Sequence, residues 1–332
     1  MRKRPLTTVN RRSFSMLLAA ATLFGSAAAC AAEPLKVGYS DWPGWVAWQV
    51  AIDKGWFAQA GVDVKFEWFD YSASMDAFSA GKLDAVLVAN GDALVMGSSG
   101  AKSQMVLLTD YSAGNDMVIA KPGLNSIADL KGKKVAAEVG LVDHLLLRNA
   151  MQRAGLKAGD ITIVNAKTNE LPQVLASKDI SAVAVWQPVA NEAMKAVPGS
   201  KPVYTSADEP GLSYDALAVN PGSLKAHRAE WQKMVGVWDR VVAYINDPKT
   251  QPDAVKIMAA RSGVTPAEYL PLLKGTHLLS VDDGRKAFVK ASGYASLYGS
   301  TEIVNTFNWY NKVYAISQNV NNYIDPSFVG AK

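Results

Sequence analysis

An internal repeat narrows the folds open to this chain more than any other feature of its sequence. Lys36-Val37-Gly38 is echoed by Lys134-Val135-Ala136, and the stretch from 80 to 88 is echoed by the stretch from 176 to 185. The two offsets are nearly equal, 134 − 36 = 98 and 182 − 85 = 97 residues, and short chance matches would not be expected to share them. The repeat predicts two lobes that are built alike.

Short strand-like runs alternate with amphipathic helical runs as far as about residue 220. The expected strands are 35–39, 62–69, 85–89, 103–109, 117–120, 134–138, 161–165, 182–186 and 216–219, with helices such as 46–60, 73–81, 144–154 and 171–177 between them. Such alternation predicts an α/β protein with parallel, doubly wound sheets. After residue 220 we expect mainly helices, over 229–245, 252–261, 284–298 and 303–318.

The turns near residues 110–116 and 208–214 divide the chain into these lobes. We expect lobe 1 to comprise residues 33–112 and 217–332, including the C-terminal helices, and lobe 2 to comprise residues 113–216. The length of 332 residues suits two domains of roughly 100–200 residues each. Two lobes joined by two crossings place a cleft between the carboxyl ends of their strands, where open α/β sheets bind ligands.

The first 32 residues have the pattern of an export signal. They contain five basic residues and no acid, then an apolar run over 16–24, then small residues over 25–32. The stretch 10–16 resembles a twin-arginine signal, general secretion remains open, and Cys30 is either a lipidation site or lost by cleavage near Ala31 or Ala32. No later apolar run reaches about 18 residues, so we expect a soluble periplasmic protein.

Removal of this segment changes the charge from +4 to +4 − 5 = −1. A basic balance that might have pointed to nucleic acid therefore disappears from the mature chain. The single cysteine cannot form an internal disulfide, and the three histidines have no HExxH spacing. We expect no cofactor, no metal site and no nucleic-acid partner.

Several motifs, taken together in their order and spacing, make the chain resemble a periplasmic solute-binding protein of an ABC importer. It is similar to the group that binds nitrate, taurine, aliphatic sulfonates and thiamine precursors. The motifs are residues 36–39, 53–57, 60–64, 80–85, 129–135, 140–144 and 185–188. The resemblance implies the two-lobed (type II) periplasmic-binding-protein fold, a ligand cleft with two hinge crossings, and a monomer that delivers a small molecule to a membrane permease without catalysis.

The loops expected to line the cleft carry carboxylates and aromatic rings and contain no lysine or arginine. The candidate ligand-binding residues are Asp41, Trp42, Trp45, Asp70, Tyr71, Asp92, Glu138, Asp143, Trp186 and Asp215. Carboxylates form bidentate hydrogen bonds to N–H groups, and aromatic faces attract cations. Because a buried charge must be paired, several acids in one cleft predict a cationic or strongly N–H-donating ligand.

The start of lobe 2 separates this ligand class from an anion. In relatives that bind oxyanions, a glycine there is followed by two Ser or Thr residues, one further residue and a histidine. Here Leu141 and Val142 occupy the hydroxyl positions, and Asp143 adds negative charge before His144. The chain also resembles binding proteins encoded beside urea- and guanidine-carboxylase systems, which implies guanidinium or a urea-like ligand.

Other interpretations of the same residues stay open at this point. Asp70, Asp92 and Asp143 could cap helices, Trp48 and His144 suit structural roles, Trp186 suits either the core or the site, and Asp215 could hold a hinge. The ligand could instead be a sulfonate, taurine, nitrate or a thiamine-pyrimidine precursor. A periplasmic enzyme that uses cleft acids for proton transfer is a further alternative.

Overall fold

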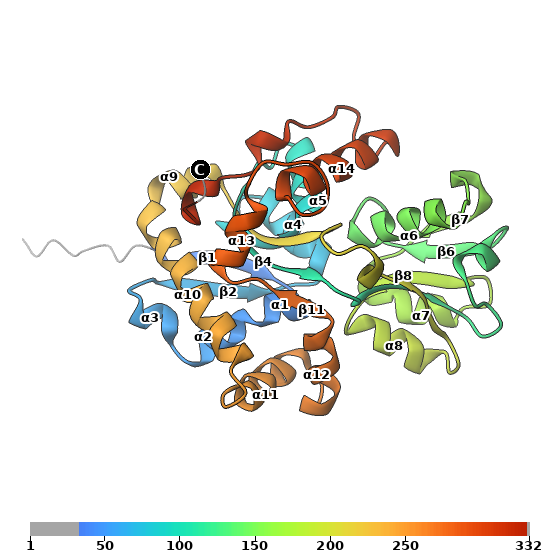
Figure 1. Cartoon of the computed structure of the whole chain (residues 1–332), viewed down its shortest axis with the longest axis horizontal. Coiled ribbons are helices and arrows are strands. Elements are labelled where there is room, and N and C mark those ends of the chain that lie inside the picture. The colour runs from blue at the N-terminus through green and yellow to red at the C-terminus, as the bar shows by residue number, and fades with distance from the viewer. Residues whose placement is uncertain (1–32, 331–332) are drawn as a thin grey trace, which may run out of the picture. The chain divides into compact units, whose positions relative to one another are not determined.

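The computed structural model describes residues 33–330, so the predicted export signal and Cys30 lie outside the described residues. From Pro34 onward the chain forms one compact unit that contains two β-sheets (Figure 1). The first sheet has the strand order β11-β4-β10-β3-β1-β2 and the second β7-β6-β8-β5-β9. Among residues 33–330, no helix has the length and apolar character needed to cross a membrane.

The first sheet takes its strands from both ends of the chain. They are β1 (Leu35–Tyr39), β2 (Val64–Trp68), β3 (Ala85–Ala89), β4 (Gln104–Ser112), β10 (Tyr214–Val219) and β11 (Thr276–Leu278). β1 runs parallel to β2 and β3, whereas β10 runs antiparallel to both β3 and β4. The register between β10 and β4 places Asp215 opposite Asp110.

The second sheet is formed by the intervening strands. They are β5 (Asp116–Ala120), β6 (Lys134–Ala137), β7 (Thr162–Asn165), β8 (Ala182–Trp186) and β9 (Lys201–Thr205). β6 is parallel to β7 and β8, but β5 is antiparallel to β8 and β9. The prediction of parallel sheets is therefore wrong in part. Both sheets are mixed. The strands β5 and β10 follow the crossings between the sheets instead of a helical crossover, and they run antiparallel to their neighbours.

Alternate residues of β5 face opposite sides of the second sheet, as a two-residue period requires. Val118 and Ala120 pack with α6, whereas Met117 and Ile119 pack with α7 and α8. The valine, isoleucine and alanine side chains of the inner strands β5, β6 and β8 are almost completely buried. This two-sided burial explains why the sequence of the strands reads as continuous apolar runs.

Helices cover both sheets, and two of the predicted ones are interrupted. The predicted helix 46–60 is three short helices, and Gly55 between the last two has a left-handed φ of 64°. The predicted helix 284–298 is wrong because the helix that begins at Val281 ends at Ala287. The helices are α1 (Pro43–Val46), α2 (Trp48–Asp53), α3 (Trp56–Gln59), α4 (Tyr71–Ser79), α5 (Asn90–Ser98), α6 (Val142–Arg153), α7 (Leu171–Ala176), α8 (Val189–Ala196), α9 (Pro221–Ala226), α10 (Arg228–Asn246), α11 (Gln251–Ser262), α12 (Pro266–Lys274), α13 (Val281–Ala287) and α14 (Leu297–Tyr310).

Short 3₁₀ turns complete the described secondary structure, over Ile127–Leu130, Ala158–Asp160, Thr168–Glu170, Ser206–Asp208, Val320–Asn322 and Pro326–Phe328. Trp48 of α2 is completely buried and its ring lies 4.7 Å from that of Trp238 in α10. The interpretation of Trp48 as a core residue is confirmed. These helices anchor the strands of the first sheet, whose ends carry the candidate site.

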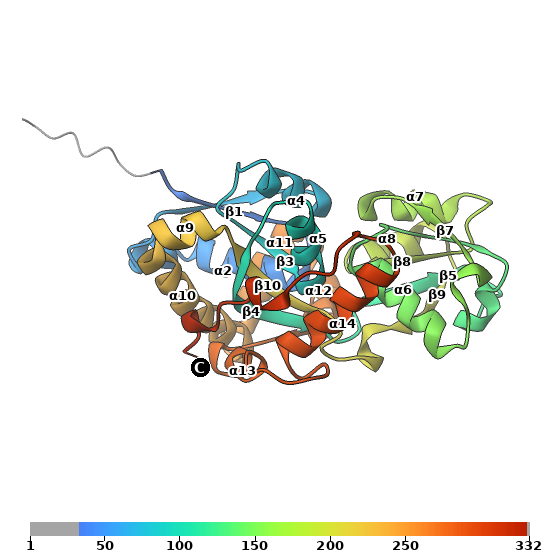
Figure 2. The same ribbon diagram turned by 90° about the horizontal axis from the view of Figure 1, so that it is seen from above.

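The C-terminal helix α14 lies against both α5 and α6 (Figures 1 and 2). Gly91 in α5 permits this approach, because a Cβ atom there would come within 2.4 Å of Val304. Val304 also packs with Leu145 and Leu146 of α6. The helix thus contacts elements attached to both sheets, next to the start of α6.

Candidate functional site

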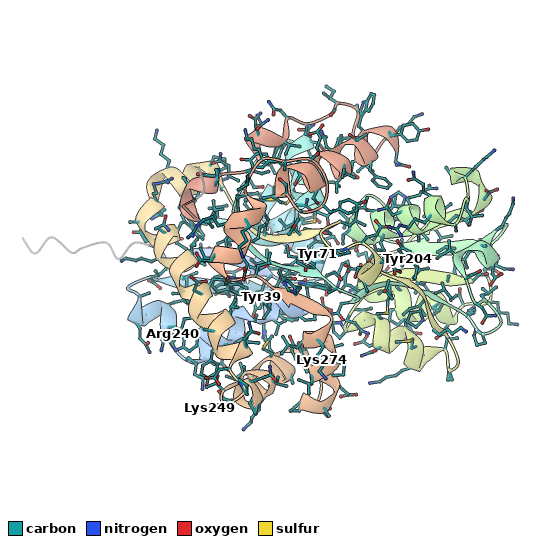
Figure 3. All side chains as sticks on the ribbon, in the orientation of Figure 1. Tyr39, Tyr71, Tyr204, Arg240, Lys249 and Lys274 are labelled. Atoms are coloured by element: carbon teal, nitrogen blue, oxygen red, sulfur yellow. The ribbon has the colours of Figure 1, made fainter. Side chains whose placement is uncertain are left out.

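The predicted cleft residues meet where the strands of the two sheets end toward each other. The first sheet contributes residues after β1 and β3 and at the start of β10, and the second contributes residues around β5, β6 and β8. Tyr71 at the start of α4 lies at this meeting point (Figure 3). A narrow cavity here has room for about one water molecule and is lined by Trp42, Trp45, Tyr71, Ala89, Asp116, Val142, Trp186, Ser213 and Asp215.

Aromatic side chains form one wall of this cavity. The ring of Tyr71 lies 5.2 Å from the ring of Trp186, edge-on, and 5.0 Å from that of Trp45. The indole N–H of Trp42 donates a 2.8 Å hydrogen bond to a carboxylate oxygen of Asp110. The indole nitrogen of Trp45 is buried without a hydrogen-bond partner. These rings present apolar faces and edges to a small planar group.

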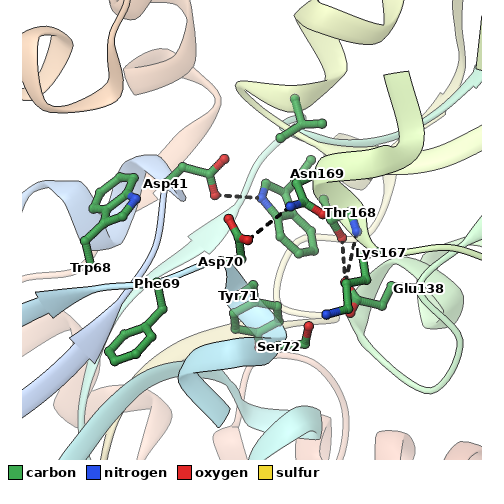
Figure 4. A pocket seen from close by; sticks show the side chains of 12 residues that line it. Asp41, Trp68, Phe69, Asp70, Tyr71, Ser72, Glu138, Lys167, Thr168 and Asn169 are labelled. Carbon is green, nitrogen blue, oxygen red and sulfur yellow. Dashed lines mark hydrogen bonds between the residues drawn. The ribbon is translucent and has the colours of Figure 1, made fainter. Parts of the chain in front are cut away.

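A second pocket opens beside the first and is walled by both sheets' elements (Figure 4). The indole N–H of Trp186 donates to Asp41 at 3.4 Å, and the side-chain amide of Asn169 donates to Asp70 at 3.1 Å. Both hydrogen bonds connect the first sheet's loops to the second sheet's. Lys167 is the basic residue that lines this pocket.

Six buried acids converge around the cavity, and we call them the carboxyl cluster. None has more than 8% of its surface exposed: Asp92, Asp110, Asp116, Glu138, Asp143 and Asp215. Within residues 33–330 no member forms an ion pair with a lysine, arginine or histidine. In the same part of the chain no set of three or more acids, histidines or cysteines is arranged to hold a metal ion.

Some members of the carboxyl cluster are partly satisfied by hydrogen bonds. Tyr71 donates its hydroxyl to Asp92 at 2.7 Å, and Thr168 donates both its N–H (3.1 Å) and its hydroxyl (3.0 Å) to Glu138. Asp110 accepts from Trp42 and, at 2.8 Å, from the hydroxyl of Thr109. Hydrogen bonds from neutral groups compensate only part of the cost of burying a carboxylate.

Asp143 is the exception within the carboxyl cluster. It lies in the first turn of α6 with no exposed surface, and both of its carboxyl oxygens lack a hydrogen-bond partner. Burial raises its pKa well above the usual range, and the negative charges of Asp116, Glu138 and Asp92 raise it further. A buried, unpartnered carboxyl of this kind costs free energy in the protein alone.

Burial is also the main cause of the other raised pKa values. It raises the pKa of Asp92 to about 7, although the Tyr71 hydroxyl and the Val142 N–H act in the opposite direction. It raises the pKa of Asp116 to about 7 and that of Asp110 to about 6. The pKa of Asp215 is raised well above its usual range by burial and by the charges of Asp110 and Asp116.

The structure brings most of the predicted site residues together. Trp42, Trp45, Tyr71, Trp186 and Asp215 line the cavity. Tyr71, Trp186, Asp41, Asp70 and Glu138 line the neighbouring pocket. Asp92 and Asp143 line neither pocket; Asp92 accepts the hydroxyl of the lining residue Tyr71, and Asp143 interacts electrostatically with Asp92. Asp70 differs from the buried acids because it is exposed.

The alternative that the aspartates cap the helices they begin is wrong for all three candidates, although Asp92 accepts the N–H of Val142 at the start of a different helix, α6. Asp70 occupies the N-cap position of α4 but makes no capping hydrogen bond. Asp92 lies inside the first turn of α5 and accepts from Tyr71. Asp143 lies inside the first turn of α6 and accepts from nothing. Asp70 lines the neighbouring pocket, whereas Asp92 and Asp143 are buried and line neither that pocket nor the cavity.

The structural interpretation of His144 is confirmed. Its Nδ1 accepts the N–H of Gly140 at 3.2 Å, and its ring contacts Phe307 of α14. Burial lowers its pKa to about 4. His144 thus holds the turn before α6 as a neutral side chain.

Sequence reasoning missed Asp110 and Asp116 as candidate site residues. Both flank the first crossing, Asp110 near the end of β4 and Asp116 at the start of β5. Each of these acids lies near the end of an otherwise apolar strand, beside the crossing between the predicted lobes. That position could have identified them as candidates. The register that sets Asp110 opposite Asp215 could not be read from the sequence.

Comparison with known proteins agrees with this architecture. A protein-family model described as NMT1/THI5 like matches residues 42–251. A binding protein of Brucella abortus is 32% identical over 202 residues, which are 60% of this chain and 62% of that protein. The chain thus spans about 62% of the length of this curated relative.

Two further proteins cover more of the chain at lower identity. The taurine-binding periplasmic protein of Escherichia coli is 23% identical over 258 residues, 75% of this chain and 76% of that protein. The solved alkanesulfonate-binding protein from Xanthomonas axonopodis, bound to MOPS, aligns with a TM-score of 0.73 and 17% identity, over 89% of this chain and 99% of that one. The latter confirms the two-lobed periplasmic-binding-protein fold, and the matched family model shows that the chain belongs to the NMT1/THI5-like family.

Proposed function

We propose that this protein is the substrate-binding component of an ABC importer and that its ligand is a small, planar nitrogenous solute, either the guanidinium cation or a urea-like compound that also donates several N–H groups. It captures the solute between its lobes and delivers it to a membrane permease. The family and fold support the binding role. The acidic, aromatic-walled cavity supports the ligand class.

The observation that carries the ligand class is the state of Asp143. Both of its oxygens are buried and unpartnered, and the charges that raise its pKa are those of further acids. A cation with several N–H donors would satisfy this carboxylate and offset the repulsion within the carboxyl cluster. Guanidinium is planar and presents parallel N–H groups that match a carboxylate in bidentate geometry.

The lining of the cavity supports the same ligand class. Trp42, Trp45, Tyr71 and Trp186 surround it. A flat cation between such rings gains about 0.5–2 kcal/mol from each favourable cation–π contact. Asp116 and Asp215 at the same cavity offer carboxylates at its edge.

A sulfonate, taurine or nitrate ligand is the second candidate, because relatives are named for binding taurine and sulfonates. Helix N-termini bind anions through free backbone N–H groups. Here the N–H of Val142, at the start of α6, hydrogen bonds to Asp92. Leu141 and Val142 provide no hydroxyl group, and Asp143 would repel an anion. These contacts favour the cation over the anion.

The location and partner follow from the binding role. Relatives named as periplasmic proteins support export, and delivery to a permease requires the protein to act at the outer side of the inner membrane. We propose a monomer that shuttles between solution and the permease. The mechanism is a ligand-dependent shift toward the conformation in which both lobes contact the solute.

Calorimetric titration of the purified protein with guanidinium, urea, taurine and nitrate tests the ligand. Guanidinium or urea should bind, whereas tight taurine or nitrate binding without a guanidinium signal would refute the cation proposal. Asp143→Ser separates the two classes. A cation binder should lose about 2–5 kcal/mol of affinity, as expected for removing one partner of a buried charge pair, whereas an anion binder should tolerate the change or gain from it.

Two further measurements bear on the function. Mass spectrometry of the molecule that copurifies with the protein should identify a small nitrogen-rich solute. Incubation of that solute with the protein should return it unchanged. Turnover would instead support the alternative of a periplasmic enzyme that uses cleft acids for proton transfer.

A further inference from the structure

We infer that protons and the cationic ligand compete for the carboxyl cluster, so that each cation that binds displaces at least one proton and acidification releases the ligand. The inference rests on the proposed function, because it assumes that the ligand is a cation. It concerns the regulation of the same site.

The geometry requires some positive charge between the two sheets' acids. The first sheet and its helices contribute Asp92, Asp110 and Asp215, and the second sheet and α6 contribute Asp116, Glu138 and Asp143. These acids interact across the junction, since Asp92 is affected by Glu138 and Asp116, and Asp143 by Asp92. With all six ionised and buried, this arrangement would carry six uncompensated negative charges.

The remaining groups that face the carboxyl cluster do not supply that charge. From α4, Tyr71 is a neutral hydroxyl donor to Asp92, and from β10, Tyr214 is a neutral phenol whose hydroxyl donates to the carbonyl of Tyr294. After β1, Asp41 adds another acid. On α6, Arg148 donates to the carbonyl of Ala158 instead. Lys167, which precedes α7, lines the neighbouring pocket and not the cavity.

Either protons or a cation can therefore stabilise this arrangement. The pKa values of Asp92 and Asp116 are raised to about 7, and those of Asp41 and Asp110 to about 6, all chiefly by burial. Near neutral pH the ligand-free protein thus holds protons that a guanidinium ion would replace. When the ligand binds, the positive charge of guanidinium replaces that of the protons. Lower pH favours the protonated, ligand-free site.

Calorimetric titration with guanidinium at pH 7, in two buffers that differ in ionisation enthalpy, counts the protons released. We expect at least one per cation bound. The dissociation constant should also rise as pH falls from 8 to 5, by up to tenfold per pH unit for each proton displaced. Guanidinium itself keeps its charge throughout this range, so the change reports the protein's acids.

Two variants sharpen the experiment. Asp143→Asn keeps the size of the side chain and removes one titrating group. Whatever its affinity for guanidinium, this variant should release fewer protons on binding, and its dissociation constant should change less with pH. Asp76→Asn is the matched control, because Asp76 is an exposed acid on α4 outside the carboxyl cluster. It should leave both readouts unchanged.

The outcomes distinguish the two proposals. Guanidinium binding with no proton release and a constant affinity from pH 5 to 8 would overturn the competition and leave the binding function intact. A pH dependence that persists in full in Asp143→Asn and disappears in Asp76→Asn would also overturn it. Absence of guanidinium binding at every pH would refute the proposed ligand, and the competition with it.

Discussion

Replacing Asp92 by asparagine should stabilise the ligand-free protein, and the gain should grow with pH. Asp92 is 2% exposed, and burial raises its pKa from 3.8 to about 7. Between these two values the folded state keeps a proton that the unfolded state has lost. An acid with a raised folded pKa therefore loses stability as pH rises through this window.

The magnitude follows from the same pKa values. Each pH unit within the window costs the wild-type protein about 1.4 kcal/mol of unfolding free energy, so about 3 kcal/mol is lost between pH 5 and pH 7. Asparagine does not titrate, and its carbonyl oxygen can still accept the Tyr71 hydroxyl that Asp92 accepts at 2.7 Å. The difference in stability between Asp92→Asn and the wild type should thus increase by about 3 kcal/mol across that interval.

Chemical denaturation of both proteins at pH 5, 6 and 7 without ligand measures this difference. His144 has a pKa lowered to about 4 by burial, so its own contribution rises with pH between 4 and 6.5. That contribution is common to both proteins and cancels. The exposed Asp76→Asn variant should show no pH-dependent gain. A gain for Asp92→Asn that is constant with pH, or a loss at pH 7, would refute the reasoning.

Three further changes test other parts of the structure. Trp186→Phe keeps a ring beside Tyr71 but removes the N–H that donates to Asp41. The affinity for guanidinium, measured by calorimetry, should fall by about 0.5–2 kcal/mol. An unchanged affinity would argue against a role for this ring in binding. Gly97→Ala would place a Cβ 2.2 Å from the Tyr323 ring and should cost about 1–3 kcal/mol in denaturation; an unchanged midpoint would contradict this packing. Asn169→Ala removes an exposed hydrogen bond to Asp70, so the free energy of unfolding should change by less than about 1 kcal/mol. The dissociation rate of guanidinium, measured by stopped flow, should increase. An unchanged rate would argue that this hydrogen bond does not help to hold the two lobes together around the ligand.

The strand positions could be predicted because burial on both faces leaves a continuous apolar signature. The runs 35–39, 85–89 and 182–186 coincide with β1, β3 and β8 to the residue. The strands β9 and β11 were missed because they lack that signature. β9 contains Lys201 and Pro202 at an edge of its sheet, and β11 is three residues long. Edge strands need less apolar sequence, so composition reveals them poorly.

The site was predictable in part for a related reason. Acids that flank apolar strands or begin helices stand out, which identified Asp92, Asp143 and Asp215. Asp116 was missed although it lines the cavity, because its role depends on the crossing that turns β5 back against β8. The pairing of Asp110 with Asp215 depends on antiparallel register, which two separate segments define only when folded.

A purely structural role does not account for the carboxyl cluster. If these acids served stability, each would be expected to have hydrogen-bond donors or a counter-charge, as buried polar groups generally do. Asp92, Asp110 and Glu138 have donors, but Asp143 has none. Asparagine would fill the same space as Asp143 without a titrating charge, so an acid there is costly unless something binds it. Local rules are broken in this way chiefly at functional sites. The unpartnered carboxyl of Asp143, which also interacts with Asp92 of the opposite sheet, is the group that the proposed cation would satisfy.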